Sequence, residues 1–366
     1  KIIIFYPFVD AFGGIERNII SFISSINKRK INYEVVCFRN LINWKKYNNK
    51  KSINIKILGG INIIDRIIKF KNYSKKANPI GKILCFGEKG SFFAYLAGIK
   101  NFTVHYTDPP QLSLNFLESK NFLISLKRKL ALKICNLGLL RCRSIIVTTK
   151  KNRRDIKKIF NVSSKVIYSA GYNFYKKKKF PVKTLFKGDK INLLSIGRLS
   201  PNRNIDWLID FINYCKLNEK KLFRKLTLNI IGDGEERIKI LSLVNKYKLQ
   251  GKVKFYFIAN DNLTKKILLK SDIFLLPAVQ GYGLPALEAL YVNIPVVSNH
   301  YSRISEILKN NPWVSLTKNH KKDFIRKSLI HIKAMKLKLP NYEILRKLPT
   351  EESFSSNVAR VCGWWK

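Results

Sequence analysis

The chain has 366 residues, of which 46% are hydrophobic and 12% aromatic, and its 70 Lys and Arg residues against 23 Asp and Glu residues give a formal net charge of +47. This length favours two domains over one core, and the hydrophobic content excludes a largely disordered or fibrous chain. So positive a chain attracts nucleic acid, anionic lipid head groups or phosphorylated substrates. A drift in composition, visible in the many Ile and Asn residues, explains the charge equally well.

From the sequence we expect neither a secretory leader nor a membrane span. It opens on a strand-like apolar run, and its most apolar long stretch, 121–147, is interrupted by six basic residues, so it falls short of the roughly 20 apolar residues that cross a bilayer. We therefore expect a cytoplasmic protein whose membrane contact is at most peripheral, on the inner face of the cytoplasmic membrane. Six cysteines without zinc-site spacing are predicted to be buried thiols of a reducing compartment: Cys37, Cys85, Cys135, Cys142, Cys215 and Cys362.

Short runs rich in Ile, Val and Phe alternate with longer amphipathic segments along the whole chain, which is typical of βα units around parallel sheets. We predict an α/β protein with two doubly wound domains. In the first half the predicted strands are 2–6, 33–38, 53–58, 82–86, 102–106, 144–149 and 165–169.

The alternation lapses between Tyr172 and Lys190. This stretch is basic, contains Pro181 and Gly188 and has no apolar period. After it, strands are predicted at 191–196, 226–231, 253–257, 273–277 and 295–298, with helices at 205–215, 235–247 and 284–292. The predicted organisation is a Rossmann-like domain at 1–172, a basic linker at 173–190, a second Rossmann-like domain at 191–348 and a final segment at 349–366.

Ligands of open α/β sheets bind where strands end and loops pass into helices. After the first strand comes GGIER, in which Gly13 and Gly14 open a helix that runs to about residue 26. Paired glycines let a backbone approach a ligand closely, and the amides at a helix start favour a phosphate. A tight structural turn is the equally weighted alternative.

The second domain opens with SIGRLSPNRNIDWLI, a strand followed by a loop that carries Arg198 and Arg203. Two guanidinium groups at this point suit the oxygens of a diphosphate, whose charge they would neutralise in place of a metal. Solvated surface arginines are the alternative. A later turn, IIGDGEER, is interpreted as mostly structural, and its Asp233 and Glu235 are the nearest approach to an Asp-x-Asp pair.

The most specific stretch is SDIFLLPAVQGYGLPALEALYVNIPVV, at 271–297. A buried strand ends near Pro277, and Gly281 and Gly283 in the following loop permit close approach to a ligand. Glu288 lies about one turn into the next helix, where a carboxylate suits the two hydroxyls of a ribose. An ordinary solvated acid on the helix face is the alternative for Glu288.

These motifs resemble those of the family 4 retaining glycosyltransferases, also described as glycosyl transferases group 1. That family carries GGxE near its start, G-R-L-x-x-x-K at the first strand of the second domain, and E-G-F-G-L-P-x-x-E-A later. The resemblance extends over most of the chain and is strongest from Ile191 to Leu308; before that, GGIER, VHYTD and the stretch from SIIVTT to YSAGYN carry it.

The resemblance implies the GT-B fold, in which two Rossmann-like domains face each other across a cleft and the C-terminal segment crosses back to the first domain. The helical and aromatic segment 353–365 suits that docking. It also implies that a nucleotide diphosphate sugar is the donor. Because no Asp-x-Asp pair occurs in a suitable loop, we expect no metal or other cofactor to take part. The acceptor would be a glycan or a lipid-linked glycan of surface polysaccharide or lipopolysaccharide synthesis.

For the site, the resemblance assigns the donor diphosphate to Arg198 and Arg203 and the ribose to Glu288. His105 corresponds to the family's frequent active-site histidine, although a loop imidazole that caps a strand end is the alternative, and Asp108 is a weaker candidate. The resemblance implies that a further set contacts the sugar and phosphates: Gln280, Gly281, Tyr282, Gly283 and Leu284.

Two residues depart from the family pattern. Arg203 replaces a Lys and keeps the charge. Gln280 replaces the first Glu of the family's acidic pair, and a neutral amide cannot stabilise positive charge at the anomeric carbon. A non-catalytic sugar-nucleotide-binding scaffold is therefore the alternative to an enzyme.

A nucleic-acid-binding protein is suggested by charge alone, and we expect no nucleic acid partner because no nucleic-acid-binding motif is recognised. The basic helical stretch 121–143 suggests contact with anionic lipid.

Overall fold

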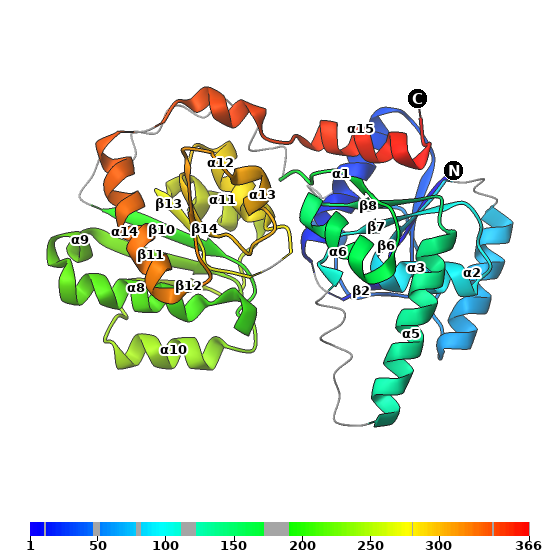
Figure 1. The fold of residues 1–366 in the computed structure, drawn as a ribbon, viewed down its shortest axis with the longest axis horizontal. Helices are drawn as coiled ribbons and strands as arrows, with labels where there is room; N and C mark the ends of the chain where they lie inside the picture. Colours follow the sequence, from blue (N-terminus) through cyan, green and yellow to red (C-terminus); the bar gives the residue numbers. More distant parts are fainter. Residues whose placement is uncertain are drawn as a thin grey trace. The chain divides into compact units, whose positions relative to one another are not determined.

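The computed structural model describes residues 1–10, 12–46, 52–77, 82–110, 122–171, 190–279, 281–338 and 340–365. They form two compact units, the first from Lys1–Ala170 and Pro349–Lys366 and the second from Gly171–Leu348 (Figure 1). Except for Lys190, the expected linker lies outside the described residues.

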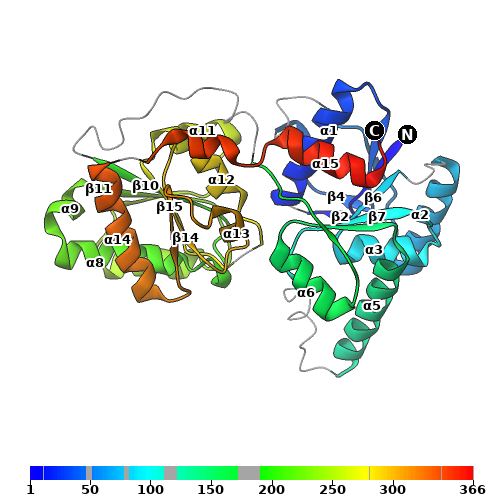
Figure 2. The same cartoon turned by 45° about the horizontal axis from the view of Figure 1, so that its top comes forward.

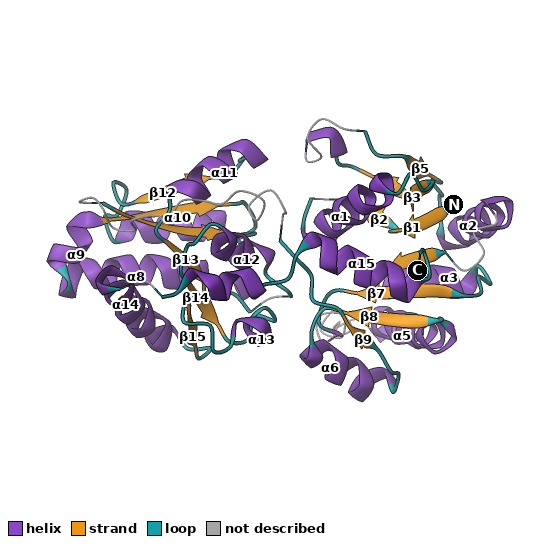
Figure 3. Ribbon diagram, turned by 90° about the horizontal axis from the view of Figure 1, so that it is seen from above, coloured by secondary structure: helices purple, strands orange, loops and turns teal. Residues whose placement is uncertain are grey.

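The first unit is built on a parallel sheet with the strand order β5-β3-β1-β6-β7-β8-β9 (Figure 3). The order reverses between β1 and β6, so this is a doubly wound sheet with its switch point beside β1. The strand bounds are β1 Ile2–Phe5, β3 Tyr33–Cys37, β5 Ile55–Ile57, β6 Ile83–Phe86, β7 Phe102–Tyr106, β8 Ser144–Val147 and β9 Lys165–Val166. Beyond the ends of β1 and β3, the two-residue strands β2 (Phe8–Val9) and β4 (Arg39–Asn40) pair with each other.

Helices cover both faces of the first sheet because the central strands are apolar on both sides. One face packs against α1 (Gly14–Lys28) and α15 (Glu351–Cys362), and the other against α2 (Ile63–Ala77), α3 (Gly87–Leu96), α5 (Phe122–Arg141) and α6 (Lys150–Phe160). The short helix η1 spans Trp44–Lys46.

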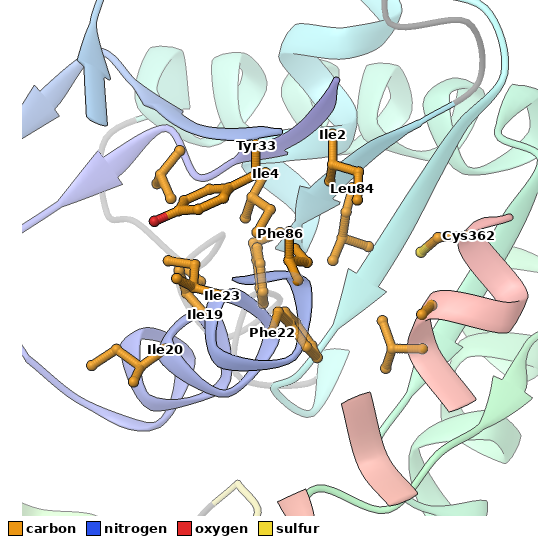
Figure 4. Close-up of a cluster of buried hydrophobic side chains, with 14 of the residues drawn as sticks. Ile2, Ile4, Ile19, Ile20, Phe22, Ile23, Tyr33, Leu84, Phe86 and Cys362 are labelled. Atoms are coloured by element: carbon orange, nitrogen blue, oxygen red, sulfur yellow. The ribbon is translucent and has the colours of Figure 1, made fainter. Parts of the chain in front are cut away.

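Helix α1 packs through residues at helical spacing, and Figure 4 shows Ile19, Phe22 and Ile23 beside the sheet residues Ile4 and Phe86. The end of the chain completes this core. Phe354 of α15 is buried against Phe22, with their ring centroids 5.1 Å apart, and α15 lies alongside α1 (Figure 2).

The second unit is built on a parallel sheet with the order β12-β11-β10-β13-β14-β15, whose switch point lies between β10 and β13. Its strands are β10 Ile191–Ile196, β11 Leu226–Ile231, β12 Val253–Tyr256, β13 Ile273–Leu276, β14 Val296–Asn299 and β15 Val314–Thr317. Its helices are η2 Pro201–Arg203, α8 Ile205–Asn218, α9 Lys220–Lys225, α10 Arg237–Lys246, α11 Asp261–Lys270, α12 Leu284–Tyr291, α13 Ser305–Leu308, α14 Lys321–Leu337 and η3 Tyr342–Lys347.

The prediction of two doubly wound α/β domains is confirmed in each unit. The prediction missed β15, whose residues are mostly half-buried at the edge of the sheet, and the two-residue strands β2 and β4. β15 and these two-residue strands lack the continuous apolar run that predicted the other strands, so the sequence pattern gave no signal for them.

Candidate functional site

In the second unit, the loops that follow β10 and β13 are hydrogen-bonded to each other at the switch point. The amide of Val279 donates to the carbonyl of Asn202 at 2.8 Å, and the side-chain amide of Asn204 donates to the carbonyl of Pro277 at 3.0 Å. The side chain of Asn299, at the end of β14, donates to the same carbonyl at 3.0 Å. The structure thus joins the ends of three strands into one edge, the position where doubly wound sheets bind ligands.

Both predicted arginines belong to the first of these loops. Arg198 follows β10 after a single glycine and its side chain is exposed, whereas Arg203 ends η2 and is half-buried. The next residue, Asn204, adopts the left-handed conformation and begins α8. This short turn keeps both guanidinium groups at the carboxyl edge of the sheet.

The glycine turn after β11, which the sequence analysis interpreted as mostly structural, supports that loop. The amide of Leu199 donates to the carbonyl of Asp233, and the amide of Glu236 donates to the carbonyl of Leu199, each at 3.0 Å. A Cβ atom on Gly232 would lie 2.0 Å from the carbonyl oxygen of Gly197, so no larger residue fits. The turn therefore holds the arginine loop in place.

Helix α12 begins after Gly283, whose φ of 88° is in the left-handed region that favours glycine. Tyr282 and Leu284 are buried, and Gly281 accepts a hydrogen bond at its carbonyl from the amide of Arg303 at 3.0 Å. Glu288 lies one turn into the helix and is 4% exposed, so it is not a solvated surface acid. Gln280 lies outside the described residues.

The sequence interpretation singled out neither Gly171 nor Tyr291, which lie next to Glu288. The amide of Gly171 donates to the hydroxyl of Tyr291 at 3.2 Å, and a Cβ atom on Gly171 would lie 2.8 Å from Cγ of Glu288. Only a glycine lets the chain come so close to this carboxylate. Arg303, which is buried and bonded through its amide to the Gly281 loop, was also missed.

The remaining predicted residues belong to the first unit. Gly13 and Gly14 are exposed at the start of α1, and the amide of Gly13 donates to the carboxylate of Glu16 at 2.8 Å. Glu16 is buried and also accepts from the hydroxyl of Tyr6, and its burial raises the pKa of the carboxyl. The GGIER turn is therefore a helix cap closed by its own glutamate.

His105 is fully buried in β7, between the rings of Phe22, Phe86 and Phe354. Within the described part of the chain neither ring nitrogen has a hydrogen-bond partner, and burial lowers the pKa of the imidazole to about 3. The imidazole is therefore closed off from solvent in this structure, and it does not cap a strand end. The sequence placed His105 correctly in a strand but did not show that α15 covers it.

No cluster of three or more His, Cys, Asp or Glu side chains in the described ranges is arranged to hold a metal ion. Across the same ranges, no helix combines the length and the apolar character required to cross a membrane.

Solved structures share the whole fold. WaaG, a glycosyltransferase involved in lipopolysaccharide biosynthesis, superimposes with a TM-score of 0.76 at 14% identity, over 99% of this chain and 100% of WaaG. HepE of Anabaena, solved in complex with UDP, gives a TM-score of 0.74 at 16% identity over 100% of both chains. The protein therefore has the GT-B fold of these glycosyltransferases.

Sequence comparison gives the family. Residues 176–340 match the model of the family "Glycosyl transferases group 1". The matched stretch covers most of the second unit and includes the motifs between Ile191 and Leu308 that carry the resemblance.

Curated relatives match over part of their length. The O-antigen chain mannosyltransferase RfbU of Salmonella typhimurium is 26% identical over 59% of each chain. An uncharacterised glycosyltransferase of Methanocaldococcus jannaschii is 27% identical over 46% of each chain. The chain spans about half the length of these curated relatives.

Proposed function

We propose that the protein is a retaining, metal-independent glycosyltransferase. It moves a sugar from a UDP- or GDP-sugar to a glycan or lipid-linked acceptor in the synthesis of bacterial-type surface polysaccharide or lipopolysaccharide. The observation that carries the proposal is the joined edge of the second unit, where the loop of Arg198 and Arg203 is hydrogen-bonded to the loop that leads into α12 and Glu288.

Each group has a role in this proposal. Glu288 accepts hydrogen bonds from the ribose hydroxyls, and the amides around Gly283 face the sugar and phosphates. Arg198 and Arg203 neutralise the diphosphate as it departs, while the acceptor hydroxyl attacks from the same face of the sugar. Two guanidinium groups in an arrangement fixed by the glycine turn act as preorganised charge, and preorganised charge is the main source of rate enhancement in many transfer reactions.

The proposal is tested with donors labelled in the sugar. Release of the nucleoside diphosphate from UDP-glucose and from GDP-mannose is followed with lipopolysaccharide and lipid-linked sugar diphosphates as acceptors. Arg198→Ala should lower kcat/KM by a factor equivalent to about 2 to 4 kcal/mol. Arg326→Ala, which removes an exposed arginine of α14 paired with Asp323, should transfer at the wild-type rate. Transfer by Arg198→Ala at that same rate overturns the assignment.

A non-catalytic scaffold is the second candidate, favoured by Gln280 in the position of the family's first acid. If the native protein shows no turnover and Gln280→Glu creates it, the chain is a binding protein that kept the fold. If the native protein turns over, the scaffold hypothesis is excluded.

We also propose that α5 places the first unit against an anionic membrane, on the inner face of the cytoplasmic membrane. Leu126, Leu130, Leu137 and Leu140 are exposed and follow one another at spacings of four, seven and three residues, which puts them on one stripe of the helix. The opposite side of α5 packs on α3, where Ser91 donates to the carbonyl of Cys135 at 3.1 Å.

Exposed basic residues flank this leucine stripe at Lys127, Lys129 and Arg141, and Lys133 lies within it, three residues after Leu130. An apolar stripe bordered by cations is the pattern of a helix that lies in an anionic lipid interface. A second copy of the helix is a poor occupant of the stripe because the two sets of cations would repel each other.

Vesicle flotation tests the membrane proposal. The protein should float with vesicles that contain phosphatidylglycerol and stay behind with phosphatidylcholine alone. The double variant Leu130→Ser, Leu137→Ser should lose flotation, whereas Leu217→Ser, which changes an equally exposed leucine of the second unit, should keep it. Equal flotation of the double variant and the wild type would contradict the role of α5.

A further inference from the structure

Three cationic side chains gather around the ring of Phe8 in the first unit. The guanidinium carbons of Arg39 and Arg66 lie 5.7 Å and 5.3 Å from the ring centroid, and Nζ of Lys89 lies 5.5 Å from it. They come from three elements, β4, α2 and α3, so the fold rather than local sequence brings them together. We call Arg39, Arg66 and Lys89 the basic cluster.

The carboxylates nearby do not balance this charge. Asp10 accepts two hydrogen bonds from Arg39, at 2.9 Å and 2.8 Å, and Asp65 pairs with Lys69 at 3.0 Å. Nε of Arg66 donates to the carbonyl of Gly60 at 3.1 Å. In the described ranges, neither Arg66 nor Lys89 forms an ion pair with a carboxylate, so the cluster keeps an excess of positive charge.

The position of Lys89 adds to this excess. It is the third residue of α3, where the helix dipole and the free amides of the first turn favour an anion and disfavour a cation. Glu88, the acidic residue of the same first turn, precedes Lys89, and a lysine there beside two arginines still favours binding of an anionic ligand.

The basic cluster also lies where the fold binds ligands. Phe8 follows β1, Arg39 follows β3 and α3 follows β6 directly, so all three belong to the carboxyl edge of the sheet around the β1/β6 switch point. Exposed isoleucines adjoin it: Ile61, 92% exposed, follows the glycine that accepts from Arg66, and Ile63, 53% exposed, lies three residues before Arg66 on the same side of α2.

We propose that the basic cluster binds a phosphate or diphosphate group of the acceptor, and that Ile61 and Ile63 contact an apolar chain attached to that group. This inference rests on the proposed function, because it assigns the first unit to the acceptor. It specifies the acceptor's class as an amphiphilic phosphate, with Arg66 and Lys89 as the phosphate ligands and Arg39 held in place by Asp10.

Acetylation of lysines by an N-hydroxysuccinimide ester, read residue by residue with mass spectrometry, tests this site on the full chain. Inorganic phosphate, inorganic pyrophosphate or decyl phosphate is added at an ionic strength held constant with sodium chloride. Pyrophosphate and decyl phosphate should protect Lys89. Lys100, an exposed lysine that precedes β7 at the opposite edge of the sheet, should react at the same rate throughout.

Variants locate the effect. Arg66→Gln should raise the concentration that gives half-protection of Lys89 about tenfold, as expected for one charge-assisted hydrogen bond, and Arg66→Lys should keep most of the protection. Arg198→Gln, which changes the donor site, should leave protection of Lys89 unchanged. A wrong assignment of the donor site and a wrong assignment of the basic cluster therefore give different experimental results.

Three results would overturn the proposal. If Lys89 reacts equally fast with and without pyrophosphate, or if Arg66→Gln is protected at the wild-type concentration, the cluster binds no phosphate. If decyl phosphate protects no better than inorganic phosphate, no apolar chain is held beside it, and the acceptor is not an amphiphile bound in this way.

Discussion

Replacing His105 with leucine tests whether the first unit buries a neutral imidazole. In the folded protein burial lowers the pKa of His105 from 6.5 to about 3. The unfolded chain therefore binds a proton below pH 6.5 that the folded chain does not accept until about pH 3, and the stability of the first unit falls as the pH drops through that window. Leucine has a similar size and no proton to bind, so His105→Leu removes this loss.

The magnitude follows from the size of the pKa shift. One pH unit inside the window costs about 1.4 kcal/mol per proton, so a change from pH 7 to pH 5 should cost the wild type about 2 kcal/mol more than His105→Leu. Burial raises the pKa of Glu16, which has the opposite sign and favours folding as the pH falls. That contribution is common to both proteins and cancels in the comparison.

The assay is a urea titration with pulse proteolysis at pH 7 and pH 5, in which peptides from β1 and β7 report the first unit alone. Phe22→Leu is the matched control, because it alters the packing around His105 without removing the titrating group. Its loss of stability between the two pH values should equal that of the wild type.

Equal losses for His105→Leu and the wild type would refute the reasoning. The imidazole would then be protonated or hydrated in the folded state, and a role for His105 at a substrate would be open again.

Three further predictions concern the framework of the site. Gly232→Ala should destabilise the second unit by about 2 kcal/mol or more, because its Cβ atom would meet a backbone oxygen at 2.0 Å. Gly251→Ala, with open space around the new Cβ atom, should not destabilise it. Urea titration of the second unit measures both effects. Gly171→Ala should weaken nucleotide binding, measured by calorimetry, because its Cβ atom displaces Glu288. Truncation after Thr350 should lower the melting temperature of the first unit, because it removes α15 from its core; an unchanged melting curve would contradict the role of α15.

Much of the fold could be predicted because parallel strands that are buried on both faces have continuous apolar sequences. Ile191–Ile196 and Leu226–Ile231 were predicted with the bounds that the structure has. Val314–Thr317 was not, since an edge strand that is half-buried has no such run.

The residues of the candidate site also separate into those that could be predicted from the sequence and those that could not. Arg198, Arg203 and Glu288 could be proposed from the sequence because each comes after a recognisable strand, and the loops at the carboxyl ends of a doubly wound sheet's strands gather at one edge. Gly171 could not, because its contact with Tyr291 joins residues 120 positions apart. His105 was interpreted as a site residue since no pattern in the sequence reveals that Phe354, from the end of the chain, lies against it.

The basic cluster was equally hidden from the sequence. Among 70 Lys and Arg residues, nothing marks Arg39, Arg66 and Lys89 until the fold brings them to one ring. Net charge predicted an anionic partner without locating it.

Calorimetric titration of UDP, GDP and ADP into the protein tests the central claim, that the joined edge of the second unit holds a nucleoside diphosphate. At least one of the three should bind, and its Kd should rise about tenfold or more in both Arg203→Ala and Glu288→Gln while Arg326→Ala binds as the wild type does. Binding of none of the three, or binding that neither of the first two variants weakens, would contradict the account.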